Sequence, residues 1–394
     1  MPMLLKRTCP EGPSLTLDLY GRDALLNPQA TYRRIRDAGG VVWLPKHRMW
    51  VMGRYQHVRD ALRDDDTFRS GKGVGANWLV NLLSQGTTLT SDGQPHIARR
   101  RVLSRSLSVK ALCAVDRTLQ QEALVVTRRL LNLASFDGVS DFAAHLPVRV
   151  VADLVGVDVA VTRMRSWARS SFDGLGPINR RALAALPPGV GLWRYAHSLR
   201  PHDVKTGKWA ASVLAGYDSA LSLAERQAMV IDFIAPSIDT TILASAQMLW
   251  SLGSNPDVWQ ELRENPDLVP AAAVEAVRLA SPVRGFTRIV QRDNEIDGSV
   301  LRAGQRVVLL YASANTDETY FEQPEVFSLH RTETNLGFGF GAHACAGMHL
   351  TKLELHALLR AMIPAVSQIS VSEPVPLLNN TLQGFASFRA AFRN

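Results

Sequence analysis

The spacing of apolar residues along the chain changes twice, and each change predicts a different kind of secondary structure. The stretch VVWLPKHRMWVMGRY places apolar runs on both sides of a polar turn and predicts two short strands, between the helical patterns NPQATYRRIRDAGG and YQHVRDALRDDDTF. From about residue 94 to 368 helical periods dominate, most clearly in SLSVKALCAVDRTLQQEALVVTRRLLNLA. Strand patterns return in VRGFTRIVQRDNEIDGSVLRAGQRVVLLYASAN. We therefore expect a mainly α fold with small β sheets.

Two segments, Gly71 to Gly93 and Pro177 to Gly191, are rich in glycine or proline. We expect both to be irregular loops that border a pocket, with one short helix in the first. No repeat, low-complexity tract or Ser/Gly linker divides the chain, so one domain over residues 1–394 is expected. The most apolar long segment, Met229 to Leu252, is interrupted by two aspartates and a proline, which favours a buried helix over a membrane span.

Composition, net charge and cysteine spacing limit which kinds of protein and of binding partner the chain fits. The 394 residues are 46% hydrophobic and 20% charged, enough to bury a large core, and 44 Lys and Arg against 36 Asp and Glu give a formal net charge of +8. That excess suits nucleic acid, a phosphorylated ligand or an acidic protein, and charge alone does not choose among them. Cys9, Cys113 and Cys345 are too far apart for a disulfide framework or a zinc site, and the N-terminal apolar stretch is too short for a signal peptide. A reducing, cytoplasmic setting without a membrane is expected.

The stretch NLGFGFGAHACAGMH surrounds Cys345 with four glycines and precedes an apolar helical pattern. The sulfur is therefore expected at a helix N-terminus, where free N–H groups and the helix dipole lower the pKa of a thiol. A thiolate there can ligate iron, Gly347 would leave room for a flat macrocycle, and Phe338 would limit access of water. A small core hydrophobe and a nucleophile are the alternatives, although His343 is poorly placed to be its base.

This stretch resembles the haem-binding loop of the cytochrome P450 family, F-G-x-G-x-H-x-C-x-G. The chain matches every fixed position of that pattern, with Phe338, Gly339, Gly341, His343, Cys345 and Gly347. The resemblance implies a triangular helical prism with haem b between a long distal helix and the helix that follows the cysteine. It also implies that Cys345 is the axial thiolate of the haem iron.

Two further residue pairs occur where the family has them. Glu275 and Arg278 share a helical face and are either a surface ion pair or, by resemblance, the family's E-x-x-R, with Arg331 as its third member. His96 and Arg100 lie one turn apart on a helical pattern and are similar to the family's H-x-x-x-R. The resemblance implies that these two residues, with Arg288 and His343, hold the haem carboxylates.

The distal motif is present with a departure. By resemblance to A/G-G-x-D/E-T, Thr240 takes part in oxygen activation and Asp239 in proton delivery; the alternative is an aspartate and a threonine that only cap a kink. Pro236 and Ser237 replace the family's small residues. A kink is expected at the proline, and Ser237 adds a hydroxyl near the oxygen site.

The resemblance also implies partners. A ferredoxin or flavodoxin, with its NAD(P)H reductase, would dock on the thiolate side near Arg99, Arg100, Arg101, Arg105 and Lys352, which explains the excess charge without nucleic acid. No flavin- or nicotinamide-binding glycine motif is seen, so no fused reductase is expected. The chain is similar to soluble bacterial members and is expected to be a monomer.

The substrate pocket is predicted by the same resemblance, and most of its positions are apolar. The predicted lining residues are Trp78, Leu79, Asp232, Phe233, Pro236, Val283 and Phe385. The segments ANTDETYFEQPEVF and NNTLQGF look most like members that oxidise small aromatic acids, for which Lys72 or Arg284 would bind the carboxylate. Asp232 would instead suit an amine.

Two functions follow from these patterns. The first is a haem-thiolate monooxygenase of secondary metabolism that hydroxylates, epoxidises or dealkylates a small, largely apolar or aromatic molecule. The second is a protein of the same fold that catalyses coupling, rearrangement or peroxide-driven oxidation, or that binds or senses ligands, with Pro236 and Ser237 as the sign of divergence.

Overall fold

The two apolar runs near residue 45 form the predicted strands, β1 (Val41–Leu44) and β2 (Met49–Met52), which pair antiparallel. The structure is a computed structural model that describes residues 11–216 and 221–394. Three strands from elsewhere in the chain complete a five-stranded sheet in the order β1-β2-β8-β5-β3: β3 (Phe68–Arg69), β5 (Phe286–Val290) and β8 (Arg306–Leu309). The strands of the two sequence regions are thus one sheet.

Two smaller sheets lie apart from this one. The first has the order β4-β10-β9, and the second pairs β6 with β7. Their bounds are β4 (Phe136–Asp137), β6 (Asn294–Ile296), β7 (Ser299–Leu301), β9 (Gln368–Pro376) and β10 (Phe385–Arg393).

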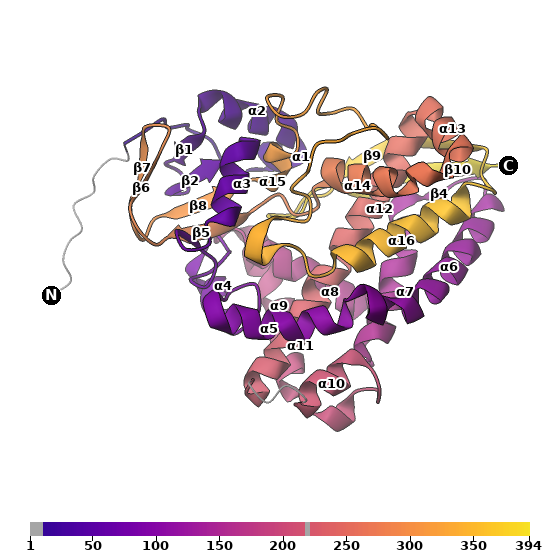
Figure 1. The fold of residues 1–394 in the computed structure, drawn as a ribbon, viewed down its shortest axis with the longest axis horizontal. Helices are drawn as coiled ribbons and strands as arrows, with labels where there is room; N and C mark the ends of the chain where they lie inside the picture. The colour runs from indigo at the N-terminus through magenta and orange to yellow at the C-terminus, as the bar shows by residue number, and fades with distance from the viewer. Residues whose placement is uncertain (1–10, 217–220) are drawn as a thin grey trace.

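Helices make up most of the remaining structure (Figure 1). The helices before the long central pair are α1 (Arg22–Leu26), α2 (Pro28–Ala38), α3 (Tyr55–Arg63), α4 (Trp78–Leu83), α5 (Gly93–Ser106), α6 (Val109–Leu131), α7 (His145–Val155), α8 (Val161–Gly174), α9 (Arg180–Ser198) and α10 (Trp209–Ala215). The others are α11 (Leu223–Ser237), α12 (Asp239–Ser254), α13 (Pro256–Glu264), α14 (Val269–Ala280), α15 (Tyr311–Ala314) and α16 (Met348–Met362). Short π- or 3₁₀-helical segments cover Gly138–Ala143, Pro201–Asp203, Pro266–Leu268 and Gly341–His343.

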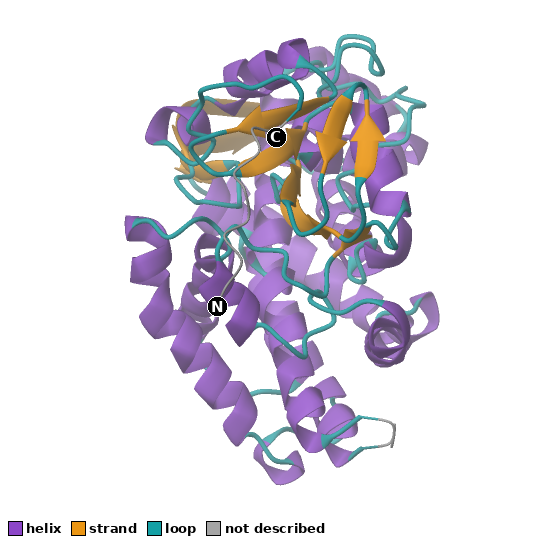
Figure 2. Cartoon of the chain, turned by 90° about the vertical axis from the view of Figure 1, so that its left-hand side faces the viewer, coloured by secondary structure: helices purple, strands orange, loops and turns teal. Residues whose placement is uncertain are grey.

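Apolar side chains are buried in separate clusters on the helical side and on the strand side. Figure 2 shows the strands within one half of the view, with helices around and below them, whereas Figure 1 shows that β6 and β7 lie toward one end of the molecule and β4 and β10 toward the other. The largest cluster packs α6, α7, α11, α12, α14 and α16 together, and a second surrounds fully buried Trp50 and Tyr55 beside the five-stranded sheet. The predicted mainly α fold with small β sheets is confirmed.

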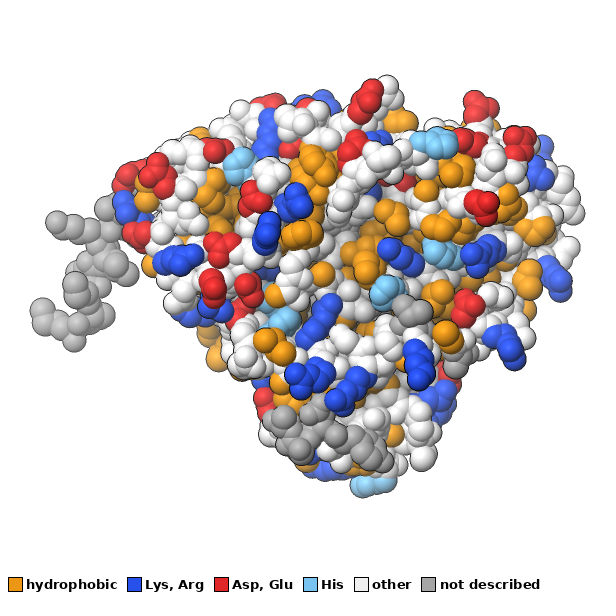
Figure 3. All heavy atoms as spheres, viewed as in Figure 1, with side chains coloured by type: hydrophobic (Ala, Val, Ile, Leu, Met, Phe, Trp, Pro, Cys, Tyr) orange, Lys and Arg blue, Asp and Glu red, His pale blue; other side chains and the backbone are white. Residues whose placement is uncertain are grey.

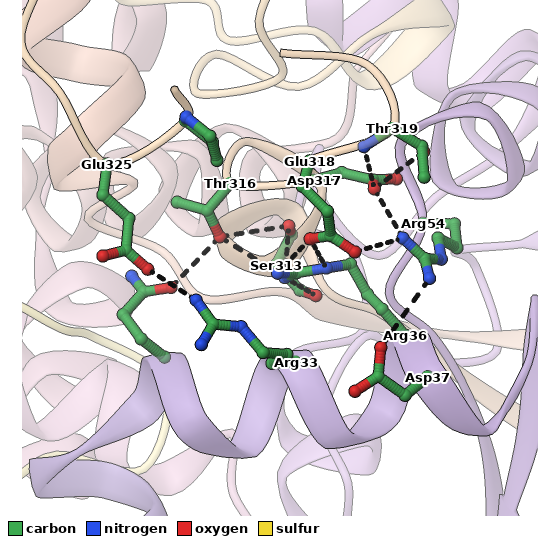
Figure 4. Close-up of polar contacts among 12 residues, drawn as sticks. Arg33, Arg36, Asp37, Arg54, Ser313, Thr316, Asp317, Glu318, Thr319 and Glu325 are labelled. Atoms are coloured by element: carbon green, nitrogen blue, oxygen red, sulfur yellow. Dashed lines mark hydrogen bonds and ion pairs between the residues drawn. The ribbon is translucent and has the colours of Figure 1, made fainter. Parts of the chain in front are cut away.

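Ion pairs fasten α2 to the segment that follows α15 (Figure 4). The guanidinium of Arg36 lies 2.7 Å from a carboxylate oxygen of Glu318, and that of Arg54 lies 2.8 Å from Asp317. Burial acts to raise the pKa of Glu318, but hydrogen bonds to its backbone and to these arginines outweigh it and lower the pKa to about 2. This network fixes the start of the chain segment that leads to the cysteine loop.

One predicted loop is a helix. The segment Pro177 to Gly191 was expected to be irregular, but α9 runs through it and contains Pro187 and Pro188. Its residues Ala185 and Leu192 are buried against the helical core, so packing outweighs the loss of backbone hydrogen bonds at the prolines. In the other predicted loop, α4 is the one expected short helix.

The apolar segment Met229 to Leu252 lies inside the molecule, as predicted. The helical region Leu223–Ser254 is long and apolar enough to cross a membrane by length and composition, and 67% of its most apolar window is buried within the protein. It is the long central pair α11 and α12. The predictions made for the N-terminal stretch fall mostly on residues 1–10, outside the described residues.

Candidate functional site

The glycines of the cysteine loop let it fold tightly against its neighbours. Cys345 lies two residues before the N-cap of α16, and its N–H donates to the Phe338 carbonyl at 2.7 Å. Gly339 and Gly341 have φ values of 70° and 71°, which disfavour other residues. A Cβ atom on Gly341 would also lie 2.4 Å from the carbonyl oxygen of Leu62. Glycine therefore permits the close contact between this loop and α3.

The Cys345 thiol faces a cavity of about 790 Å³. Burial raises its pKa, while the N–H groups of Gly347 and Met348 and the charge of Arg100 act in the opposite direction. The helix terminus thus acts to lower the pKa of the thiol, as predicted, but desolvation is the larger effect and the net shift is upward. A bound metal cation would supply the positive charge that the thiolate needs.

Four predicted cofactor ligands line the same cavity: His96, Arg100, Arg288 and His343. The rings of His96 and His343 lie 4.2 Å apart. Among the described residues neither Nε2 has a hydrogen-bond partner, although that of His343 lies 3.7 Å from a carboxylate oxygen of Asp92. Burial, together with the charges of His343 and Arg100, lowers the pKa of His96 to about 4. Donors and cations at one edge and a thiol nearby fit a flat apolar group that carries carboxylates, as haem does. Phe338 and Gly347 also line this cavity.

The long central helix is interrupted above the cysteine. Helix α11 ends at Ser237 and α12 begins at Asp239, with Ile238 between them. The Thr240 hydroxyl donates to the Pro236 carbonyl at 2.6 Å, and the Ser237 hydroxyl donates to the carbonyl of Phe233. The expected kink is present, and the threonine hydroxyl occupies the backbone acceptor that the kink exposes.

Asp239 is the first residue after this break, and its side chain does not line the cavity. Its side chain is buried, and within the described part of the chain its Oδ2 has no hydrogen-bond partner. The Nε atom of half-exposed Arg169 lies 3.8 Å from that oxygen. Burial raises the pKa of Asp239, partly offset by Arg169 and Arg165. The Asp239 carboxyl thus lies next to Thr240, which lines the cavity, and next to Arg169, which is exposed to solvent.

Glu275, Arg278 and Arg331 form a buried network under the cysteine loop. Arg278 donates to both carboxylate oxygens of Glu275 at 2.7 Å, and Arg331 donates to Oε1 at 2.9 Å. Arg278 also binds the carbonyl of Asn315, whose side chain accepts from the Leu336 N–H. The pair is thus not a solvated surface pair, and it connects α14 to the start of the cysteine loop.

Five of the seven residues predicted for the substrate pocket line the cavity, and two do not. Those that line the cavity are Leu79, Asp232, Phe233, Pro236 and Val283. Trp78 does not, because it points to solvent from α4 and is 67% exposed. Phe385 does not either, because the register of β10 packs its ring against Trp250 and Phe388.

The charged groups proposed to hold a substrate have other partners. Asp232 accepts the Thr88 N–H at 2.7 Å, and burial raises its pKa to about 6, against the effect of that hydrogen bond. Lys72 donates to Gln291, and Arg284 is buried and donates to the Tyr32 hydroxyl. Neither Lys72 nor Arg284 lines the cavity.

Two features of the site were missed in the sequence. Helix α9 forms a long wall of the cavity, with Trp193 and Arg194 among its lining residues, and the double proline had hidden that helix. Glu354, on α16, is fully buried against Thr241, and desolvation raises its pKa to about 8. In the sequence, the position of Glu354 among the apolar residues of a helical pattern indicates that its side chain is buried.

The basic residues expected to receive a redox partner divide into two groups. Arg101 and Arg105 are exposed on α5, and Figure 3 shows Lys and Arg side chains over this helix on the face that α16 shares. Arg99 is buried and forms an ion pair of 2.7 Å with Glu225, so it does not belong to that surface.

Comparison with known proteins gives a consistent result. The family model "Cytochrome P450" matches residues 210–381. The chain is 29% identical to cytochrome p450 CYP199A2 of Rhodopseudomonas palustris over 95% of this chain and 93% of the relative. It is 31% identical to putative cytochrome P450 126 of Mycobacterium tuberculosis over 82% of both chains. The structure of the CYP116B5 heme domain of Acinetobacter radioresistens superposes with a TM-score of 0.85, at 20% identity, over 96% of this chain and 97% of that one.

Proposed function

The chain belongs to the cytochrome P450 family, a monooxygenase family that binds haem b, and from this premise we propose that Cys345 ligates the haem iron and that the cavity beside it holds a largely apolar substrate. The observation that carries the proposal is one cavity lined by both the Cys345 thiol and a cluster of donors, in which neither histidine Nε2 has a hydrogen-bond partner among the described residues. When bound, haem b supplies thiolate-assisted oxygen chemistry at its iron.

We propose that His96, Arg100, Arg288 and His343 bind the haem carboxylates. The two histidine Nε2 atoms then gain partners, and the charges of the arginines are neutralised. The glycine-framed loop and the network around Glu275 keep the thiol aimed at the cavity.

Thr240 and Asp239 would bind and transfer protons at the break between α11 and α12. Asp239 holds a proton more readily than an exposed aspartate, and among the described residues its Oδ2 accepts no hydrogen bond that would hinder proton transfer. Arg169 connects that oxygen to solvent, and the Thr240 hydroxyl lies at the cavity wall one residue later. The Thr240 hydroxyl donates its own hydrogen to the Pro236 carbonyl, so its oxygen can still accept a hydrogen bond from the cavity. The unusual Pro236-Ser237 pair therefore leaves this role open to Thr240.

The reaction proposed is hydroxylation, epoxidation or dealkylation of a small organic molecule. Apolar side chains dominate the cavity beyond the haem edge, including Leu79, Phe233 and Val283, and they exclude water from the reacting carbon. Electrons would come from a ferredoxin or flavodoxin and its NAD(P)H reductase, and the exposed cations on α5 offer an acidic partner its docking surface.

The thiolate assignment is tested by the absorption spectrum of the reduced, CO-bound protein. We expect the red-shifted Soret band of thiolate-ligated haem in the wild type and in Cys113→Ala, which lies on α6. Cys345→Ala should lose that band. A band that survived in Cys345→Ala, or that was absent from the wild type, would disprove the assignment.

A further inference from the structure

Two chain segments that form walls of the cavity contain no acidic residues. Residues 67–91, which include α4, and residues 174–202, which include α9, contain no Asp or Glu, although 36 acids in 394 residues would give about five in these segments. Side chains from both segments line the cavity. An anion entering here meets no like charge on these walls.

Most cations on these walls already have partners. The walls carry Arg69, Lys72, Arg180, Arg181, Arg194 and Arg200. Arg69 binds Asp66 and Lys72 binds Gln291, whereas Arg181 and Arg200 donate to neighbouring amide or carbonyl oxygens. Within the described ranges, Arg180 and Arg194 form no hydrogen bond or ion pair, and of the six only Arg194 lines the cavity. A solvent-exposed guanidinium at the edge of the cavity is thus left without a protein anion among the described residues.

Arg194 lies one turn before the end of α9, and that end is held against the start of α11. Gln227, near the start of α11, donates to the carbonyls of His197 and Leu199 at the end of α9, one turn or so beyond Arg194. Thr240 lies thirteen residues after Gln227, which is about 20 Å along a helix.

The wall between these two ends is apolar. Its lining side chains on α9 and α11 include Leu183, Leu186, Val190, Trp193 and Ile231. The only carboxyl among the described lining residues is Asp232, which is taken by the Thr88 N–H. The cavity therefore combines a long apolar body with a cation, Arg194, that is separate from the predicted haem-carboxylate ligands and has no ion pair among the described residues.

We infer that Arg194 binds the anionic head group of an amphipathic substrate whose apolar chain extends along the cavity toward Cys345. The inference rests on the proposed function and specifies its substrate class as medium- or long-chain anions such as carboxylates. Arg194 is a specificity-determining residue in this scheme: its charge-assisted hydrogen bonds favour the anion, and the apolar wall holds the chain in an extended form.

The test compares ligands that differ only in the head group. The haem-loaded enzyme is titrated with dodecanoate, below its micelle concentration, and with dodecanol, below its solubility limit, by the low- to high-spin shift and by calorimetry. We expect the wild type to bind dodecanoate more tightly by about tenfold or more. Arg194→Gln should abolish most of this preference, Arg194→Lys should keep part of it, and the control Arg180→Gln should keep all of it.

Three results would overturn the inference: no preference for the carboxylate in the wild type, an unchanged preference in Arg194→Gln, or an equal loss in Arg180→Gln. Benzoate tests the length of the substrate, because a short acid held near the haem cannot reach Arg194. A loss of benzoate affinity in Arg194→Gln as large as that for dodecanoate would contradict the extended pose. The CO-bound spectrum separates the two proposals, since an intact thiolate band without a carboxylate preference rejects only the head-group site.

Discussion

Glu354 shows how burial alone changes the chemistry of a single side chain. It lies on α16 nine residues after Cys345, is 1% exposed, and its Oε1 has no partner among the described residues. Desolvation raises its pKa to about 8 from an ordinary value of 4.5, and the contact with Thr241 offsets this only in part. At neutral pH the folded protein therefore keeps this carboxyl protonated, whereas the unfolded chain does not.

We predict that this residue makes the protein less stable as the pH rises. Its contribution is full below the unfolded pKa of 4.5 and is lost as the pH rises toward the folded pKa of about 8. Each pH unit in that interval costs about 1.4 kcal/mol of the free energy of unfolding. In Glu354→Gln, which keeps a neutral group of the same shape, this part of the pH dependence should disappear.

Denaturant unfolding between about pH 6 and pH 8 measures the effect. The control is Glu373→Gln on β9, where the side chain is 72% exposed, and it should leave the slope with pH as in the wild type. A Glu354→Gln variant with the wild-type slope would show that the carboxyl is ionised in the folded protein.

At the scale of elements, α9 is the helix that its own sequence disfavours. Pro187 and Pro188 lie in its interior, where a proline removes a backbone hydrogen bond and its ring clashes with the preceding turn. Packing of the buried residues of α9 against the core offsets this cost. The result is a cavity wall that includes Trp193 and Arg194.

Pro187→Ala should therefore stabilise the protein, by up to about 3 kcal/mol in the free energy of unfolding. Pro256→Ala is the matched control, because Pro256 occupies the first turn of α13, where proline loses no helical hydrogen bond. Thermal and denaturant unfolding of both variants give the comparison. Destabilisation by Pro187→Ala would mean that the shape of α9 depends on the proline itself.

At the scale of the molecule, the cavity separates the strand-side core from the helical core and is lined by both. Its walls come from α3, α4, α5, α9, α11, α12 and the cysteine loop. Without a cofactor, these elements face each other across apolar surfaces and unpaired polar nitrogens. Haem b should thus contribute to stability as well as to chemistry.

We predict that removal of haem lowers the midpoint of thermal unfolding by at least about 5 °C, because a ligand that binds only the folded state stabilises it by mass action. Calorimetry of the haem-loaded and haem-free protein tests this directly. The difference should shrink in Cys345→Ala, which loses the proposed bond to iron. Equal midpoints would indicate that the apolar walls collapse onto each other when the cofactor leaves.

The sequence alone determined the cysteine loop, because its glycines and Cys345 form one continuous stretch whose chemistry is local. It also predicted β1, β2, α6 and the break at Pro236, which depend on short-range patterns. Tertiary structure decided the rest: α9 is helical because its buried face packs on the core, and Phe385 turns away from the pocket because of strand register. The partners of Asp232 and Arg99, and the lack of one for Arg194 among the described residues, depend on segments distant in sequence that no local pattern encodes.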